Sequence, residues 1–285
     1  EGTDSINITV HDNPTSDILV EGFPVSTTDV CASETISLNG NPSGGSGSWS
    51  SHLWQGNGAS YLSSATSVSP TFNCDSPGSY NLTYTVTDSF GCLGSDSLTI
   101  IVNASPVPDI LSNGSAVSSD WLCLNEPSVL NGNPSSGSGT YVSHVWTGPP
   151  GLLSSYSVQN PTFQTGVAGD YSFTYTVTDD LGCSGSDSIS IHVEDPTCSI
   201  RVNGSPVSTF EICAGISADL DGDAVGGSGN YSHLWTGNTA PLSSTTVEQP
   251  DFQTNNPGIY NLTYTVTDSE GCSDTDTLSV TVHPN

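Results

Sequence analysis

The sequence predicts an all-β protein built from tandem β-sandwich domains, and three observations lead to this expectation. The segment at residues 80–92, YNLTYTVTDSFGC, returns with few changes at residues 171–183 and 260–272. The copies recur about every ninety residues, so three repeats fill the chain. Each copy alternates apolar and polar residues, as a strand with one buried face does, and no part of the chain has a helical period.

The repeat spacing predicts three domains and one leading segment. Repeat 1 is expected over residues 15–105, repeat 2 over 106–195 and repeat 3 over 196–285. Residues 2–10 match residues 94–102 closely, with Ile6, Ile8 and Val10 in the apolar places. Residues 1–14 are therefore expected to be the final strand of a preceding repeat in a longer, truncated array. The alternative is a strand donated to a neighbouring subunit.

Each repeat should contain about seven short strands. It opens with a strand and turn, clearest at residues 200–206, then a cysteine and a strand such as 35–38. A Gly/Ser stretch at 43–48, a segment ending in Trp54 and the Pro-Thr-Phe of 70–72 follow. The repeat closes with a β-hairpin, because two alternating runs flank the turn at residues 88–91. A strand count of this kind is typical of a sandwich.

Six of the eight cysteines belong to a repeating pattern, with two of them in each repeat. Their regular spacing predicts disulfides and an oxidising compartment. Metal sites favour close Cys-x-x-Cys or His pairs, which the chain lacks, so zinc is disfavoured. The first expectation is a bond within each repeat, at the edge or end of a sandwich; a bond reaching into the next repeat remains open. The expected pairs are Cys31 with Cys92, Cys123 with Cys183 and Cys213 with Cys272.

Two cysteines, Cys74 and Cys198, break the repeat pattern. Cys74 replaces a threonine of the other copies, and Cys198 lies just before repeat 3. An unpaired cysteine in a secreted chain suggests a bond between molecules. The two positions are about one domain apart, too far for a bond within one extended chain. The resulting hypothesis is a staggered link between neighbouring molecules.

The charge excludes one class of partner. The chain has 29 acidic residues against the single base Arg201, a formal net charge of −28. Nucleic-acid binding needs Lys and Arg to displace counterions, so it is excluded, and an anionic membrane surface is disfavoured. No apolar run reaches the length of a membrane span. Without a basic and then apolar leader at Glu1, a mature product or an excised fragment is expected.

The residues around Trp54, 80–92, 136–148 and 159–163 resemble a known family. They are similar to the PKD-like, immunoglobulin-like repeats of large secreted surface proteins of the Bacteroidetes type. The resemblance implies immunoglobulin-like sandwiches at the cell surface, in adhesins, stalks or spacers alike. The chain departs from the Trp-Asp-Phe-Gly-Asp-Gly of familiar PKD repeats, because Gln55-Gly56-Asn57-Gly58 follows Trp54.

Three histidines are the candidates for catalysis. His52, His144 and His233 each precede the repeated tryptophan, without a nucleophilic cysteine or a repeated carboxylate beside them in sequence. A triad forms in space, so sequence alone does not settle its absence. A structural role is favoured, no catalytic residue is expected and the chain is predicted not to be an enzyme.

The repeated aspartates allow two further hypotheses. Acidic residues at the hairpin could hold calcium, but the chain has no Asp-x-Asp-x-Asp-Gly loop and aspartate also favours turns by itself. The Asp-Ser/Thr-apolar pattern resembles an O-glycosylation acceptor of the same bacteria, at Ser5, Ser97, Ser188 and Thr277. Asn81, Asn203 and Asn261 begin sequons that matter only in a host with that pathway. The hairpin aspartates are Asp88, Asp179 and Asp268, and those that open the last strand are Asp96, Asp187 and Asp276.

The sequence therefore favours a structural or adhesive module of an extracellular, cell-surface stalk or filament. Its partners would be copies of itself or neighbouring repeats, and surface glycans are possible partners. The alternative is a glycan- or ligand-binding accessory region of a secreted enzyme, with Trp49, Tyr61 and Trp121 as contact residues. An exposed patch of these aromatics would favour binding, whereas burial would favour a spacer.

Overall fold

The computed structural model describes residues 3–285 and confirms the all-β fold class. Each repeat has two four-stranded sheets and a two-stranded ladder. The ten strands of a repeat exceed the expected seven because pieces of two residues are distinct strands. In repeat 1 they are β1 (Pro14–Thr15), β2 (Leu19–Val20), β3 (Phe23–Pro24), β4 (Thr27–Cys31), β5 (Thr35–Asn39), β6 (Ser43–Gly44), β7 (Trp49–Gln55), β8 (Thr71–Asn73), β9 (Gly78–Asp88) and β10 (Leu93–Asn103).

Repeats 2 and 3 have the same order of strands within each sheet. Repeat 2 comprises β11 (Pro106–Val107), β12 (Leu111–Ser112), β13 (Ser115–Ala116), β14 (Ser119–Cys123), β15 (Ser128–Asn131), β16 (Ser135–Ser136), β17 (Tyr141–Thr147), β18 (Thr162–Phe163), β19 (Gly169–Asp179) and β20 (Ser184–Glu194). Repeat 3 comprises β21 (Pro196–Thr197), β22 (Arg201–Val202), β23 (Ser205–Pro206), β24 (Thr209–Cys213), β25 (Ser217–Asp221), β26 (Val225–Gly226), β27 (Ser232–Gly237), β28 (Asp251–Gln253), β29 (Gly258–Thr267) and β30 (Ser273–His283).

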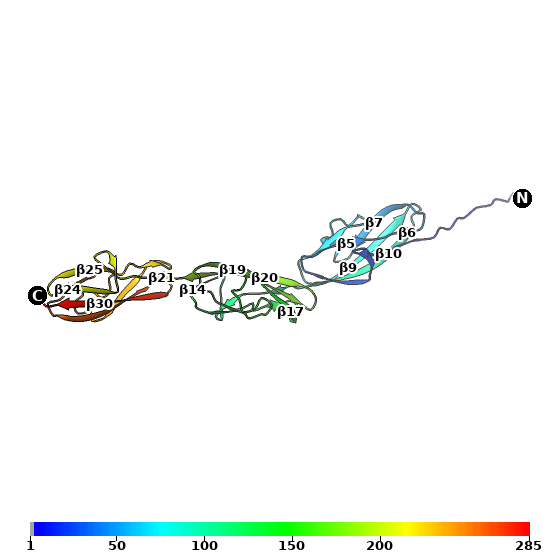
Figure 1. Cartoon of the computed structure of the whole chain (residues 1–285). Helices are drawn as coiled ribbons and strands as arrows, with labels where there is room; N and C mark the ends of the chain where they lie inside the picture. Colours follow the sequence, from blue (N-terminus) through cyan, green and yellow to red (C-terminus); the bar gives the residue numbers. More distant parts are fainter. Residues whose placement is uncertain (1–2) are drawn as a thin grey trace. The chain divides into compact units, whose positions relative to one another are not determined.

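One four-stranded sheet of repeat 1 is built on the expected hairpin and has the strand order β4-β10-β9-β7. Figure 1 labels its strands β7, β9 and β10. β9 and β10 pair antiparallel, whereas β4 pairs with β10 in parallel, from Thr27 opposite Thr99 to Cys31 opposite Asn103. The second sheet has the order β3-β2-β5-β8. In consequence the first cysteine of the repeat lies level with the residue where the last strand ends.

The core of repeat 1 follows the alternation of the sequence. Leu82, Tyr84 and Val86 on β9 are fully buried, and Leu98 and Ile100 on β10 are buried against them. The same positions form the core of repeat 3, with Leu262, Tyr264 and Val266 on β29. The predicted half-buried hairpin is thus confirmed residue by residue.

One aromatic cluster recurs in the core, and a glycine makes room for it. Trp54 lies with its ring centroid 4.7 Å from that of Tyr84 and donates from Nε1 to the Ser67 carbonyl at 2.8 Å. A Cβ at Gly40 would lie 2.2 Å from the Tyr84 ring, so only glycine fits there. Gly222 has the same relation to Tyr264. The cluster therefore fixes both a tryptophan and a glycine in the repeat.

Residues 3–13 precede the first strand and belong to no strand themselves. Ile6, Ile8 and Val10 are 83%, 78% and 88% exposed, whereas their sequence equivalents on β10 are buried. His11 stacks on Phe90 of the β9–β10 turn, with ring centroids 3.9 Å apart. The role of this segment as the last strand of another repeat, like the predicted domain ranges, stays a prediction.

Candidate functional site at the junctions between repeats

The hairpin turn of each repeat is held by the carboxylate of its buried aspartate. In repeat 1, Asp88 Oδ1 accepts the N–H groups of Phe90 and Cys92, both at 2.9 Å, and Oδ2 accepts that of Ser46 at 3.0 Å. Burial acts to raise the pKa of Asp88, but backbone N–H donors led by Cys92 outweigh it and hold the pKa below its ordinary value. Asp88 therefore fixes the backbone of the hairpin cysteine.

The other two hairpins repeat this arrangement. Asp179 accepts the N–H of Cys183 at 2.9 Å, and Asp268 accepts that of Cys272 at 2.9 Å. The aspartates had been considered as calcium ligands. Among residues 3–285, no group of three or more His, Cys, Asp or Glu side chains is placed to hold a metal ion. Their observed partners are backbone N–H groups of the turn.

Two disulfides join consecutive repeats. Cys31, at the end of β4 in repeat 1, is bonded to Cys183 in the hairpin of repeat 2, with Cα atoms 5.4 Å apart. Cys123, at the end of β14 in repeat 2, is bonded to Cys272 in the hairpin of repeat 3, with Cα atoms 5.2 Å apart. Both bonds run from the first cysteine of one repeat to the hairpin cysteine of the next.

The expected pairing within each repeat is therefore wrong. Cys31 lies level with Asn103 at one end of β10, while Cys92 precedes Leu93 at the other end. Eleven extended residues separate these ends, which is about 35 Å at ~3.3 Å per residue. A disulfide requires Cα atoms within about 7 Å, so Cys92 is out of reach of Cys31. Cys92 and Cys213 remain unpaired within this chain.

Cys74 and Cys198 are also unpaired, but their surroundings do not favour a link between molecules. Cys74 is buried at 3% exposure, so it would have to leave the core of repeat 1 to meet another chain. Burial and then the Asp274 carboxylate raise the pKa of Cys198 to about 12, which disfavours the reactive thiolate. The staggered Cys74–Cys198 bond between molecules stays a prediction, which these surroundings do not favour.

Two of the three candidate histidines, His52 and His233, bind core tyrosines. His52 Nδ1 and Tyr84 Oη are 2.6 Å apart, as are His233 Nδ1 and Tyr264 Oη. Burial raises the pKa of Tyr84 to about 12, so its hydroxyl is neutral and can donate. Sequence reasoning missed this pair because the two residues are distant in sequence. The signal was present in the sequence. Each repeat that carries the histidine two residues before the tryptophan also carries the core tyrosine.

The aspartates near the start of the last strand bind the residue that precedes the second sheet. Asp96 Oδ2 accepts the N–H of Ile18 at 2.8 Å, and Asp276 does the same for Ile200 in repeat 3. The neighbouring hydroxyl residues of the proposed glycosylation pattern are exposed, so their modification stays a prediction. These residues are Ser5, Ser97, Ser188 and Thr277.

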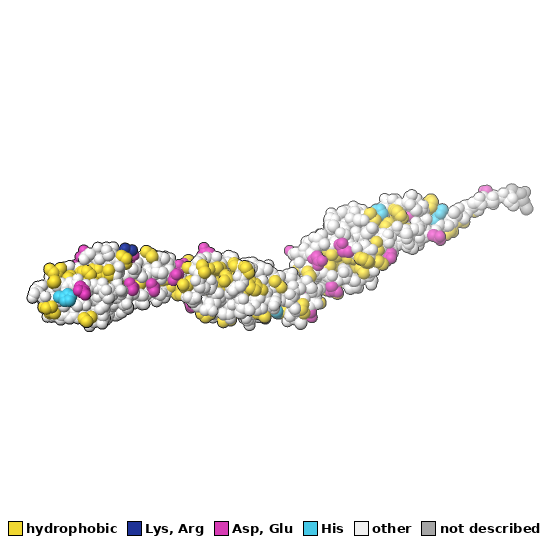
Figure 2. Space-filling view, in the orientation of Figure 1, with side chains coloured by type: hydrophobic (Ala, Val, Ile, Leu, Met, Phe, Trp, Pro, Cys, Tyr) yellow, Lys and Arg dark blue, Asp and Glu magenta, His cyan; other side chains and the backbone are white. Residues whose placement is uncertain are grey.

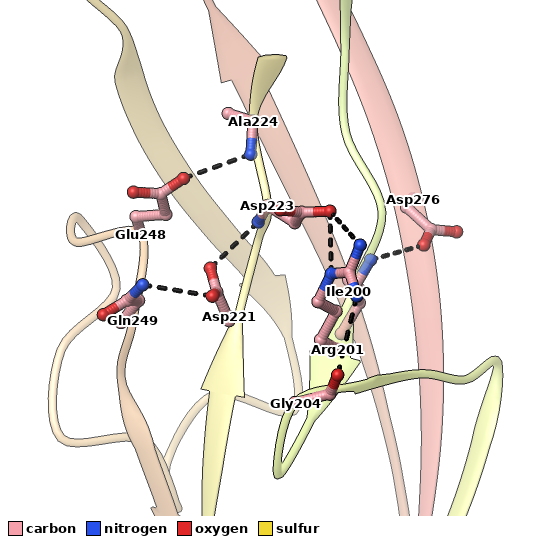
Figure 3. Close-up of polar contacts among 9 residues, drawn as sticks. All are labelled: Ile200, Arg201, Gly204, Asp221, Asp223, Ala224, Glu248, Gln249 and Asp276. Atoms are coloured by element: carbon pink, nitrogen blue, oxygen red, sulfur yellow. Dashed lines mark hydrogen bonds and ion pairs between the residues drawn. The ribbon is translucent and has the colours of Figure 1, made fainter.

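The single cation is engaged within repeat 3 (Figures 2 and 3). Arg201 forms an ion pair with Asp223 at 2.7 Å, and the Asp223 N–H donates to Asp221 at 3.0 Å. Gln249 donates to the other Asp221 oxygen at 3.1 Å. An adjacent groove of about 400 Å³ is lined in part by Asp219, Asp221 and Asp251. The polar groups at this place mostly bind one another, as a structural network does.

The aromatic candidates for ligand binding do not share one surface role. Tyr61 packs on the core of repeat 1, with its ring centroid 5.0 Å from that of Tyr80. Trp49 is 38% exposed and Trp121 is 45% exposed, and Trp121 stacks on His192 with centroids 4.3 Å apart. Tyr61 therefore contributes to packing beside Tyr80 near the start of β9, whereas Trp49 pairs with Asp88 at the other end of that strand.

Among solved structures, the chain resembles the N-terminal eight immunoglobulin domains of the Down Syndrome Cell Adhesion Molecule. The TM-score is 0.54 at 12% identity, with 96% of this chain and 37% of that chain covered. The repeats are immunoglobulin-like β-sandwiches. This likeness confirms the predicted fold class and concerns the fold alone.

Two curated relatives of the chain are dyslexia-associated proteins. The KIAA0319-like protein of Mus musculus is 29% identical over 228 residues, which cover 73% of this chain and 21% of that protein. KIAA0319 of Homo sapiens is 29% identical over 254 residues, covering 81% of this chain and 23% of that protein. The chain thus spans about a fifth of the length of these relatives. No protein-family model matches the sequence.

Proposed function

We propose that the chain is a non-enzymatic structural and adhesive module of an extracellular surface protein, whose consecutive repeats are braced by disulfides. The observation that carries this proposal is the pair of bonds Cys31–Cys183 and Cys123–Cys272. Such bonds persist in oxidising compartments outside the cytosol. Bonds that join one repeat to the next suit a chain that limits the movement of its repeats.

The brace acts because each disulfide lies beside the peptide linker. The chain leaves repeat 1 at Asn103 and enters the first strand of repeat 2 at Pro106. Cys31 is the strand neighbour of Asn103, so the disulfide to Cys183 is a second covalent connection next to the first. A single linker leaves a hinge with free torsions, while two adjacent connections restrict bending and twisting.

The surface composition supports an extracellular role. A net charge of −28 keeps an exposed array soluble and disfavours contact with anionic partners. In residues 3–285 we find no helix with the length and hydrophobicity that crossing a membrane requires. The solved neighbour with the same fold is named a cell adhesion molecule. We propose the same class of role here, as part of a stalk or filament whose partners are like repeats.

The brace is tested by small-angle X-ray scattering of two matched variants. Cys31→Ser/Cys123→Ser removes both bonds, and Cys92→Ser/Cys213→Ser removes two cysteines that are unpaired in this chain. The first variant is expected to show a broader distribution of radii of gyration than the native chain, because its linkers become hinges. The second should match the native chain when the monomers of all three proteins are isolated by gel filtration and measured. Equal distributions for all three proteins would refute the bracing role.

A further inference from the structure

Cys92 and Cys213 occupy the two places of a junction that the chain does not complete. In both formed bonds, the first cysteine of a repeat meets the hairpin cysteine of the next. This rule leaves the hairpin cysteine of repeat 1, Cys92, and the first cysteine of repeat 3, Cys213, which are both unpaired. Cys92 and Cys213 are therefore the two kinds of cysteine that together form a bond between repeats.

We propose that Cys213 forms a disulfide with the hairpin cysteine of a further repeat of this kind, and that Cys92 of a second copy of this chain can supply that cysteine, joining copies head to tail. The bond would have the same form as Cys31–Cys183 and Cys123–Cys272. The proposal relies on the proposed function only for an oxidising surrounding, since it concerns cysteines that take no part in the internal junctions.

The hairpin side of this junction is already formed. Asp88 holds the N–H of Cys92 at 2.9 Å, the distance seen for the bonded Cys183 and Cys272. Their exposure differs, since Cys183 is 1% and Cys272 2% exposed while Cys92 is only half-buried. Cys183 and Cys272 are therefore covered where each is bonded to another repeat, whereas Cys92 is not fully covered. His11 stacks on Phe90 of the same turn, and Cys92 is still only half-buried beside it.

The other side is formed as well. Cys213 lies opposite His283 in the parallel pairing of β24 and β30, as Cys123 lies opposite Glu194. The next residue, Ala214, donates its N–H to the His283 carbonyl at 2.9 Å. The same bond joins Leu124 to Glu194 at 2.9 Å and Ala32 to Asn103 at 2.8 Å. The backbone at Cys213 therefore has the same strand pairing and hydrogen bond as the backbone at Cys31 and Cys123.

Cys213 is also exposed, whereas Cys31 and Cys123 are half-buried in their disulfides. One detail departs from the pattern. The N–H of Cys31 donates to Glu34 and that of Cys123 to Glu126, but Ile216 stands at the corresponding place in repeat 3. This difference removes a side-chain acceptor and leaves the strand register unchanged.

The bond forms by two exchange steps with a small-molecule disulfide as oxidant. The thiolate of Cys213 attacks one sulfur of that disulfide and releases one thiol, leaving a mixed disulfide on the protein. The thiolate of Cys92 from a second copy then attacks the Cys213 sulfur and releases the second thiol. Two protein thiols are oxidised and one small disulfide is reduced to two thiols. Each protein thiol loses its proton to solvent before it attacks, and each released small thiolate takes up one proton.

The test is a complementation experiment with two variants of the full chain, Cys92→Ser and Cys213→Ser, incubated with oxidised glutathione. Each variant alone is expected to stay monomeric on a non-reducing denaturing gel, because it lacks one half of the junction. An equimolar mixture should give a dimer and no longer species, while the native chain gives a ladder of multimers. Reduction should return every sample to monomer. Cys74→Ser is the matched control and should form the same ladder as the native chain.

Three outcomes would overturn the proposal: a native chain that stays monomeric, dimers of either variant alone in the amount seen for the mixture, or a ladder that needs Cys74. None of them bears on the scattering test, which depends on Cys31 and Cys123. Failure of the head-to-tail link and failure of the internal brace are therefore separately visible.

Discussion

A single chain pulled from its two ends is expected to reach only about a third of its full length while its disulfides are intact. The shortest covalent path runs from the N-terminus to Cys31, across to Cys183, back along the chain to Cys123, across to Cys272 and on to Asn285. This path holds about 105 residues, so the limit is roughly 35 nm at ~3.4 Å per residue, against roughly 97 nm after reduction. Force spectroscopy with and without reductant, with the unpaired thiols alkylated beforehand, measures both limits.

Single-cysteine variants make the pulling experiment specific for the pairing. Cys31→Ser opens one bond, and the shortest path then runs through residue 123, which adds about 11 nm at ~3.4 Å per residue. Cys213→Ser is the matched control and should change nothing, because Cys213 carries no bond in this chain. A bond of Cys213 with Cys272 would instead make that variant longer by roughly 20 nm. Such a lengthening would contradict the pairing described above.

Replacing the buried tryptophan of repeat 1 should remove much of the stability of that repeat. Trp54 is 1% exposed and also loses its hydrogen bond to Ser67 when it is truncated. Trp54→Ala leaves a cavity against Tyr84 and is expected to cost about 3–5 kcal/mol of unfolding free energy. A loss of 3 kcal/mol corresponds to exchange that is faster by roughly a hundredfold in the most protected amides. Hydrogen exchange of β9 and β10, followed by mass spectrometry, measures the change in the full chain.

Trp49→Ala provides the matched control on the same strand. Trp49 begins β7 and is 38% exposed, so its truncation should cost no more than about 1 kcal/mol. The amides of β29 and β30 in repeat 3 should exchange at native rates in both variants. If the β9 amides exchanged at the same rate in Trp54→Ala and Trp49→Ala, the central packing role of Trp54 would be refuted.

The repeat architecture was predictable because local patterns determine it. The alternation from Leu82 to Val86 fixes the buried face of β9, and the turn at Asp88 fixes the hairpin. The recurrence of these segments predicts the number of repeats without any knowledge of tertiary structure. Fold class and strand hairpins therefore followed from residues that are neighbours in sequence.

The disulfide connectivity was not predictable because it depends on a pairing between distant strands. Equal spacing of Cys31 and Cys92 suggested a bond, but the parallel pairing of β4 with β10 places them at opposite ends of one sheet. The position of Cys31 beside Asn103 becomes visible only once that register is known. The histidine bond to the core tyrosine was missed for the same reason, since strand register decides that His52 meets Tyr84.

The bond between repeats 2 and 3 can be tested at one peptide bond of the native chain. Asp195–Pro196, at the first residue of β21, is the single Asp–Pro bond in the sequence. Such bonds hydrolyse selectively in warm dilute acid, and acid also keeps thiols protonated and prevents disulfide exchange. If Cys123 is bonded to Cys272, the cleaved chain runs as one species on a non-reducing denaturing gel and separates into residues 1–195 and 196–285 only after reduction. Two separate fragments without reductant would contradict the disulfide brace between repeats.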